Sequence, residues 1–325
     1  MCTALNKTIG QFHYFGRNLD LNYEYDESII VVGRKYPLKF KKIDNIDQHY
    51  AIYGVGIKHD NYPFFFDCCN EKGLSFAGLN FPGFAKFNAP QENKINLAPY
   101  ELPLYLLAKY SSIKDIKKDL EVLNIIDIPY DEHLPVATLH FILADKNECI
   151  VIEQTKDGLK IYPNPYGVLT NNPTFDFHVL NLSNYLNITN QEVNNIFLKD
   201  FDLAIFGKGL QGRGLPGDSS PCSRFVKATF LLNNIDYDDD YDRNLSQMMH
   251  VLNNVSTLVG EVKQSDGSNE YTIYSSMYET TTSTLFLRTY HHYAILKYNL
   301  DLNNVDNDDI NVINIPKDII YQNIK

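Results

Sequence analysis

The sequence predicts an α+β fold in which groups of antiparallel strands alternate with helices. Strand patterns, with alternating or β-branched apolar residues, come in clusters, and Asp157-Gly158 suits the tight turn of a hairpin over 148–162. Helical patterns fall between these clusters rather than after each strand, which disfavours a doubly wound parallel sheet. We expect strands at 28–34, 50–57, 73–79, 138–144, 148–155, 158–162, 270–278, 284–290 and 294–300, and helices at 99–109, 113–124, 174–186, 222–234 and 244–254.

Local signals support these elements. Ser112, with Asp115 three residues later, is a capping pair for the helix over 113–124. Short turns after residues 279 and 290 make the last three strands an antiparallel meander. We expect loops at 57–66 and 127–136, which carry aromatic residues, and a solvated acidic loop at 299–309.

Composition narrows the function classes. The 325 residues carry a formal net charge of −11, with 44% hydrophobic and 21% charged residues. This predicts a globular protein, which we treat as one domain over 1–325, and disfavours partners that need a basic face, such as nucleic acid or anionic membrane. No signal peptide or membrane-spanning run is recognisable, and five irregularly spaced cysteines fit a reducing compartment, so we expect a cytoplasmic protein.

A glycine-rich segment mimics a dinucleotide-binding motif. Residues 207–212 read GKGLQG, which matches G-x-G-x-x-G. That motif requires a following helix whose N-terminus holds the pyrophosphate, whereas here the chain continues RGLPGD, which favours a loop. We therefore interpret this segment as a loop near a site entrance and expect no cofactor. The cysteines show no zinc-binding spacing, so we also expect no metal.

The N-terminus carries the clearest chemical signal. Cys2 follows Met1 directly, and an initiator methionine is removed when the second residue is small. Removal would leave one residue with both a thiol and a free α-amine. An α-amine has a pKa of roughly 7.7–8.0, so it can act as a general base for the thiol without burial.

Charged residues soon follow this cysteine. If residues 3–8 and 12–17 form a hairpin, Arg17 returns close to Cys2, where a guanidinium favours the thiolate. Asp20 could then accept a hydrogen bond from the α-ammonium. The alternative is a surface turn with a salt bridge.

A set of motifs in the same order resembles one known family. MCT and FGRNLD open the chain, and then come NEKGLSFAGLNFPG at 70–83, VIEQTKDGLKIY at 151–162, GVLTNNPTFDFH at 167–178, GLPGDSSPCSRFVKATF at 214–230 and EYTIYSSMYE at 270–279. Together they resemble the choloylglycine hydrolase family of N-terminal-nucleophile hydrolases, which includes bile salt hydrolases and penicillin V acylases. The resemblance implies a four-layer αββα sandwich of two antiparallel sheets between helical layers, and a homotetramer.

The resemblance also implies roles for matching residues. Cys2 would be the nucleophile and its amine the base, with Arg17 and Asp20 as charged partners. Asn80 and Asn171 would form the oxyanion hole, although each is also typical of a turn beside proline and Asn172 is adjacent. Arg224 would stabilise charge near the thiol. Asn80 stands where many penicillin acylases of the family have Tyr, which favours the bile salt branch. The other four cysteines would be small core residues.

The substrate class stays open at this level. By position, an apolar acyl pocket would contain Leu19, His59, Tyr130, Leu134 and Leu139, although ordinary packing explains each singly. The first hypothesis is hydrolysis of the amide between a bile acid and glycine or taurine. The second keeps the chemistry with penicillin V or another N-acyl amide, and the third is a non-catalytic protein that binds steroid-like amphiphiles.

Overall fold

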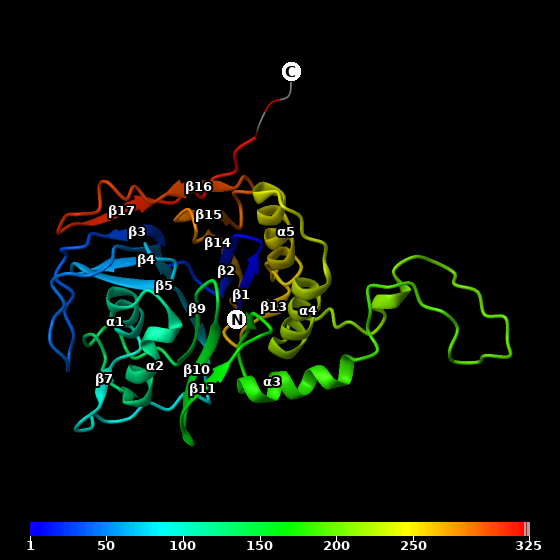
Figure 1. Cartoon of the computed structure of the whole chain (residues 1–325), viewed down its shortest axis with the longest axis horizontal. Helices are drawn as coiled ribbons and strands as arrows, with labels where there is room; N and C mark the ends of the chain where they lie inside the picture. The colour runs from blue at the N-terminus through cyan, green and yellow to red at the C-terminus, as the bar shows by residue number, and fades with distance from the viewer. Residues whose placement is uncertain (322, 324–325) are drawn as a thin grey trace.

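The computed structural model describes residues 1–321 and 323, and it has four layers (Figure 1). Two antiparallel sheets stack face to face. Helices α1 (Leu102–Lys109) and α2 (Ile113–Glu121) cover the outer face of one sheet, and α4 (Pro221–Asn234) and α5 (Tyr241–Asn253) cover the other. The expected αββα sandwich is therefore confirmed.

The first sheet contains the N-terminus. Its order is β12-β1-β2-β14-β15-β16, with β13 paired to β14. The strands are β1 (Cys2–Ile9), β2 (Phe12–Leu21), β12 (Val168–Leu169), β13 (Val262–Lys263), β14 (Asn269–Glu279), β15 (Thr284–Thr289) and β16 (Leu296–Asn299). The last three form the expected meander, and β1 lies inside the sheet between β2 and β12 rather than at an edge.

The second sheet has eight strands in the order β11-β10-β9-β6-β5-β4-β3-β17. They are β3 (Ser28–Val32), β4 (Ile52–His59), β5 (Tyr62–Asn70), β6 (Ser75–Asn80), β9 (Leu139–Ala144), β10 (Cys149–Thr155), β11 (Gly158–Pro163) and β17 (Ile310–Asn314). The β10–β11 pair is the hairpin that Asp157-Gly158 predicted. A short parallel pair, β7 (Ile95–Leu97) with β8 (Leu123–Ile125), lies outside both sheets.

Capping residues fix where the helices begin. Ser112 accepts a hydrogen bond from the backbone N–H of Asp115, as the sequence predicted. Ser220 caps α4 in the same way, with Pro221 at the first helical position, and Asp240 caps α5. The expected helix at 174–186 is shorter, since α3 (Phe175–Asn181) passes into the 3₁₀ turn η1 (Leu182–Tyr185).

Two apolar clusters hold the layers together. One joins the outward residues of the second sheet, such as Phe76 and Phe141, to the buried faces of α1 and α2. The larger one fills the space between the sheets and continues to α4 and α5 through residues such as Phe225 and Met248. Burial of these side chains is the main stabilising contribution to the sandwich.

Some expectations from the sequence are wrong. Residues 57–66 are not a loop, since β4 and β5 run through them and turn only at Asp60 and Asn61, which both have positive φ. The run Tyr62–Phe66 lacks alternation because its strand lies between other strands and contacts apolar groups on both sides. Residues 127–138 are indeed a loop, but the acidic loop ends at β17, which was not expected.

Other interpretations stand in part. The GKGLQG segment forms only the 3₁₀ turn η2 (Leu210–Gly212), so the helix of a dinucleotide site does not follow it. Cys68 and Cys69 are fully buried, but Cys149 and Cys222 are only half-buried and are not core residues in the strict sense. Over residues 1–321 and 323, no helix has the length and apolar character to cross a membrane.

Candidate active site

Cys2 opens β1 and faces the space between the two sheets. The β1–β2 register pairs Cys2 with Leu19 and Ala4 with Arg17. Because Cys2 and Ala4 point to the same face of the sheet, Arg17 lies diagonally across from Cys2 on that face. The Cys2 residue is only 2% exposed. The conditional hairpin is therefore confirmed, and the alternative of a surface turn is wrong.

Arg17 is completely buried between the sheets. Its Nη1 donates to the carbonyls of Phe66 (2.9 Å) and Gly78 (2.8 Å) on the second sheet, and its Nε donates to the Asn18 carbonyl (3.3 Å). Burial lowers the pKa of Arg17, but the neighbouring acidic groups Cys2, Tyr274, Asp67 and Asp20 more than offset this, so its pKa is raised and it stays a fixed cation.

Asp20 and the chain terminus meet at the start of β1. The Met1 α-amine donates to the Asp20 carbonyl (2.9 Å) and forms an ion pair with Glu270. The Asp20 carboxylate is fully buried and accepts from Thr272 Oγ1 (2.6 Å). Burial raises the pKa of Asp20, while Arg224 and the α-amine pull it down. Burial also lowers the pKa of the α-amine, which favours its neutral, basic form.

Arg224 and Asn171 bind the backbone of Cys2. From the first turn of α4, Arg224 Nη1 donates to the Cys2 carbonyl and to Thr3 Oγ1 (2.6 Å), and Nη2 donates to Asn171 Oδ1 (2.8 Å). The same Asn171 oxygen accepts from the Cys2 N–H (2.7 Å). Asn172 instead donates to the Pro82 carbonyl (2.7 Å), so Asn171 is the member of the pair that reaches Cys2.

Asn80 lies at the end of β6 beside Asn171. The Asn171 Nδ2 donates to the Asn80 carbonyl (2.8 Å), while the half-buried Asn80 side chain lines an open cleft of about 750 Å³. Met1, Asn171 and Glu270 line the same cleft. The predicted catalytic residues therefore come together from β1, β2, β6, α4 and the segment after β12.

Several supporting residues escaped sequence reasoning. His178 Nε2 donates to the Asn171 carbonyl (2.8 Å), and its ring stacks on Phe225. His140 bridges Glu153 (2.9 Å) and the Thr170 carbonyl (2.8 Å), next to Asn171. Burial lowers the pKa of His178 to about 4, so it stays neutral. Its only signal was its place in the GVLTNNPTFDFH motif.

The five predicted pocket residues divide into two groups. Leu19 pairs with Cys2 and Leu139 pairs with Asn80, so both lie beside the predicted catalytic residues. His59 and Tyr130 contact each other. The backbone N–H of Leu134 donates a hydrogen bond to the carboxylate of Asp131, which lies next to Tyr130 in the sequence. Tyr130 lines a separate cleft of about 410 Å³ that shares no lining residue with the cleft at Met1.

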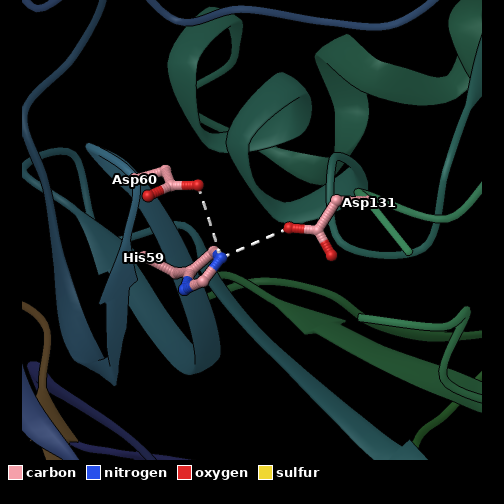
Figure 2. A group of neighbouring side chains, drawn as sticks. All are labelled: His59, Asp60 and Asp131. Atoms are coloured by element: carbon pink, nitrogen blue, oxygen red, sulfur yellow. Dashed lines mark hydrogen bonds and ion pairs between the residues drawn. The ribbon is translucent and has the colours of Figure 1, made fainter. Parts of the chain in front are cut away.

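His59 also belongs to a small polar group. Figure 2 shows its ring between Asp60 and Asp131, with Nε2 3.5 Å and 3.3 Å from their carboxylate oxygens. The three potential ligand atoms lie within 4.8 Å of one another. Because partly exposed carboxylates pair readily with imidazoles without an ion, we describe this group as a contact between the β4–β5 turn and the 127–138 loop.

Comparison with known proteins places this site in a family. The family of linear amide C–N hydrolases called the choloylglycine hydrolase family matches residues 2–313. The chain belongs to the choloylglycine hydrolase family. It is therefore a hydrolase that acts on linear amide bonds, and the resemblance drawn from the motifs is confirmed.

Individual members of the choloylglycine hydrolase family extend the comparison. The bile salt hydrolase/transferase of Lactiplantibacillus plantarum is 42% identical over 311 residues, which is 95% of each chain. A solved variant of conjugated bile acid hydrolase from Clostridium perfringens matches with a TM-score of 0.91 at 33% identity and full coverage of both chains. Penicillin V acylase from Agrobacterium tumefaciens shares the fold, with a TM-score of 0.73 at 17% identity over 97% of this chain and 91% of that one.

Proposed function

We propose that this protein hydrolyses conjugated bile salts, releasing glycine or taurine from the bile acid. The observation that carries the proposal is the convergence of Arg17, Asn171 and Arg224 on Cys2, with Asp20 beside the chain terminus, in a chain that aligns along its length with proteins named for bile salt and conjugated bile acid hydrolysis. Asn80, at the place where many penicillin acylases of the family carry Tyr, supports the same branch.

In the first half-reaction the Cys2 thiolate attacks the amide carbonyl carbon. Arg17, buried beside it, stabilises the thiolate. The carbonyl oxygen becomes an oxyanion that the Asn80 and Asn171 side chains would stabilise; Asn171 Nδ2, which donates to the Asn80 carbonyl, would have to turn toward it. Collapse breaks the C–N bond, the amine leaves with a proton from the α-ammonium, and the acyl group stays on sulfur as a thioester.

In the second half-reaction water hydrolyses the thioester. The neutral α-amine takes a proton from water, and the resulting hydroxide attacks the same carbonyl carbon. The C–S bond then breaks, which releases the bile acid and restores the thiol. Arg224, which donates to the Cys2 carbonyl, holds the terminal residue while its amine gains and loses protons, and Asp20 would accept a hydrogen bond from that amine.

The mechanism requires that Met1 be removed. In the full-length chain the α-amine belongs to Met1, which lines the cleft, and the Cys2 nitrogen is a peptide N–H that donates to Asn171. Removal would turn this nitrogen into the catalytic amine and clear the cleft mouth. Since initiator methionine is removed in the cytoplasm, a cytoplasmic location belongs to the same proposal.

Comparative turnover tests the proposal. The purified protein is incubated with glycocholate, taurocholate and penicillin V, and the released amine or acid is quantified beside an intact-mass measurement. We expect a mass that lacks one Met, faster turnover of at least one bile salt than of penicillin V, and no turnover by Cys2→Ala. Faster turnover of penicillin V would favour the acylase alternative, and binding without turnover would favour an amphiphile-binding protein.

We further propose that the protein assembles as a homotetramer. The segment between α3 and α4 projects away from the body of the molecule (Figure 1). It exposes large apolar side chains that a lone chain would leave in water, among them Leu186 (84%), Ile196 (81%), Phe197 (86%) and Phe206 (88%). Light scattering should give four chains per particle, and Phe197→Asp with Phe206→Asp should lower that number.

A further inference from the structure

Asp67 is a fully buried carboxylate that the chemistry described above does not use. It lies on β5 and faces the other sheet, where three hydroxyl groups of β14 donate to it. Ser276 and Tyr278 each donate to Oδ2 at 2.8 Å, and Tyr274 donates to Oδ1. Burial raises the pKa of Asp67, while Arg17 and the three hydroxyl donors oppose this shift and favour the ionised carboxylate.

Irregular strands accompany this arrangement. The β4–β5 register shifts between Val55 and Gly56, immediately before Asp67, and the β2–β14 register shifts between Thr272 and Tyr274. Such bulges change the direction in which a side chain points and occur often beside active sites. One shift is next to Asp67 and the other is next to Tyr274, the residue that donates to Asp67 from the facing sheet.

Arg17 lies beside this carboxylate between the two sheets. Its Nε lies 4.0 Å from Asp67 Oδ1, and both side chains are 0% exposed. Its hydrogen bonds go to neutral backbone carbonyls of Asn18, Phe66 and Gly78 rather than to a carboxylate. In a low-dielectric interior a guanidinium needs an anionic partner, and a 4 Å separation is close enough for strong attraction.

The other anion near Arg17 changes during the proposed reaction. The Cys2 sulfur is negative as a thiolate and neutral as a thioester, so it cannot balance the guanidinium throughout the cycle. The charged groups that interact with Cys2 are Arg17 of β2, Arg224 of α4 and the chain-terminal amine, and Asp20 of β2 in turn faces these three groups. Asp67 adds a negative charge that the chemistry leaves unchanged.

We propose that Asp67, held by Tyr274, Ser276 and Tyr278, is the permanent counter-charge of Arg17 and thereby limits how strongly Arg17 stabilises the Cys2 thiolate. Asp67 is a positioning residue, since it acts on the reacting sulfur only through Arg17. The inference rests on the proposed function of Cys2 as the nucleophile. It explains why a catalytic guanidinium can stay buried and charged in each chemical state of the sulfur.

The test measures the reactivity of Cys2 rather than turnover. Mature enzyme and Asp67→Asn are alkylated with iodoacetamide across a pH series, and mass spectrometry follows the N-terminal peptide so that the other cysteines do not contribute. Removing the negative charge leaves the field of Arg17 uncompensated, so we expect the midpoint of the alkylation profile to fall by about one pH unit. A merely structural role would lower stability without moving this midpoint.

Glu279→Gln is the matched control. Glu279 is also fully buried on β14 and accepts from Thr281 N (2.9 Å) and Thr282 N (3.0 Å), but it pairs with Tyr14, five residues along β2 from the partner of Cys2. Its neutralisation should leave the midpoint unchanged. Tyr274→Phe with Tyr278→Phe, which removes two of the three donors, should give a smaller fall in the same direction.

The outcomes separate the two proposals. An unchanged or raised midpoint in folded Asp67→Asn overturns the role of Asp67, and if that variant does not fold, an unchanged midpoint in the folded double Tyr variant overturns it instead. A midpoint that falls equally in Glu279→Gln also overturns it. The proposed bile salt activity is judged separately, by turnover of the wild-type enzyme.

Discussion

Arg17 and Arg224 are both buried guanidiniums close to Cys2, yet they are held in opposite ways. Arg17 projects from β2 into the space between the sheets, donates hydrogen bonds to backbone carbonyls and has Asp67 as a nearby anion. Arg224 reaches in from α4 and binds the Cys2 carbonyl, Thr3 and the Asn171 side chain. Both guanidiniums therefore lie close enough to interact with Cys2, but only Arg224 of the two also binds the Cys2 backbone among the described contacts.

Their electrostatics follow the same division. Burial lowers the pKa of both guanidiniums, but the neighbouring acidic groups, with Cys2 first among them, reverse this for Arg17 and raise its pKa. For Arg224, Asp20 and Cys2 offset burial only in part, so its pKa stays lowered. Anionic neighbours thus compensate the burial of Arg17 fully and that of Arg224 only in part, while Arg224 makes the larger set of hydrogen bonds to the Cys2 and Asn171 segments.

The largest expected effect is on stability, from Arg17→Met. It leaves the Asp67 carboxylate buried without its counter-charge, which typically costs about 3–5 kcal/mol of unfolding free energy. Urea unfolding measures this loss. Arg243→Met, at an exposed pair with Asp238, should change the same free energy by less than about 0.5 kcal/mol. Equal losses in the two variants would contradict the assignment of Arg17 to a balanced buried pair.

The next largest effect is on catalysis, at Asn171, whose side-chain oxygen accepts from both Cys2 and Arg224. Asn171→Ala removes the acceptor of two buried donors and a proposed oxyanion donor, so kcat/KM should fall by about 10²–10³-fold. Asn172→Ala is the control, because that side chain only donates to the Pro82 carbonyl and should change kcat/KM by less than about threefold. A larger loss in the Asn172 variant would reverse the assignment of the pair.

A charge-conserving change compares the two arginines directly. Arg224→Lys keeps the charge, but one ammonium cannot span acceptors on Cys2, Thr3, Asn171 and Ser219, so kcat/KM should fall by about 10–100-fold. Arg17→Lys, whose role is mainly that of a charge, should lose less. Steady-state kinetics on the preferred bile salt measures both losses. A greater loss in Arg17→Lys would contradict the claim that Arg17 acts mainly as a charge and Arg224 through its several hydrogen bonds.

The smallest effect is on the pH dependence of stability, through His178, which donates to the Asn171 carbonyl. Burial holds the pKa of His178 at about 4, below its usual 6.5, so the unfolded state binds more protons between these values. Stability from the neutral ring is complete above pH 6.5 and is lost as the pH falls toward 4. Unfolding free energy should therefore drop by about 1.5 kcal/mol more between pH 6.5 and 5 in wild type than in His178→Phe. Equal drops would contradict this.

Local patterns predicted much of the fold but less of the site. The sequence offered the β1–β2 hairpin only as a condition under which Arg17 would return close to Cys2, and the strand pairing confirms that condition. β5 was missed because a strand covered on both faces shows no alternation. Arg224 and Asn171 were assigned only through the family motifs, since the segments that bring them to Cys2 are 53 residues apart.

The network around Asp67 shows why the remainder stayed hidden. Its carboxylate and its hydroxyl donors lie more than 200 residues apart in the sequence and meet only when the two sheets stack. Whether a bulge shifts the register by one residue decides which side chains point inward, and no local pattern around Phe65–Asp67 signals that shift. Such contacts are properties of the stacked pair of sheets rather than of either strand.

The burial of the chain terminus inside a sheet has a practical consequence. The first strand is flanked on both sides, and the amine ahead of it is enclosed by Asp20 and Glu270. An affinity tag or fusion partner added in front of Met1 would have to leave through the cleft that Met1 lines. It would block substrate entry and would also prevent the removal of Met1. Recombinant forms should therefore carry their tags at the opposite end of the polypeptide.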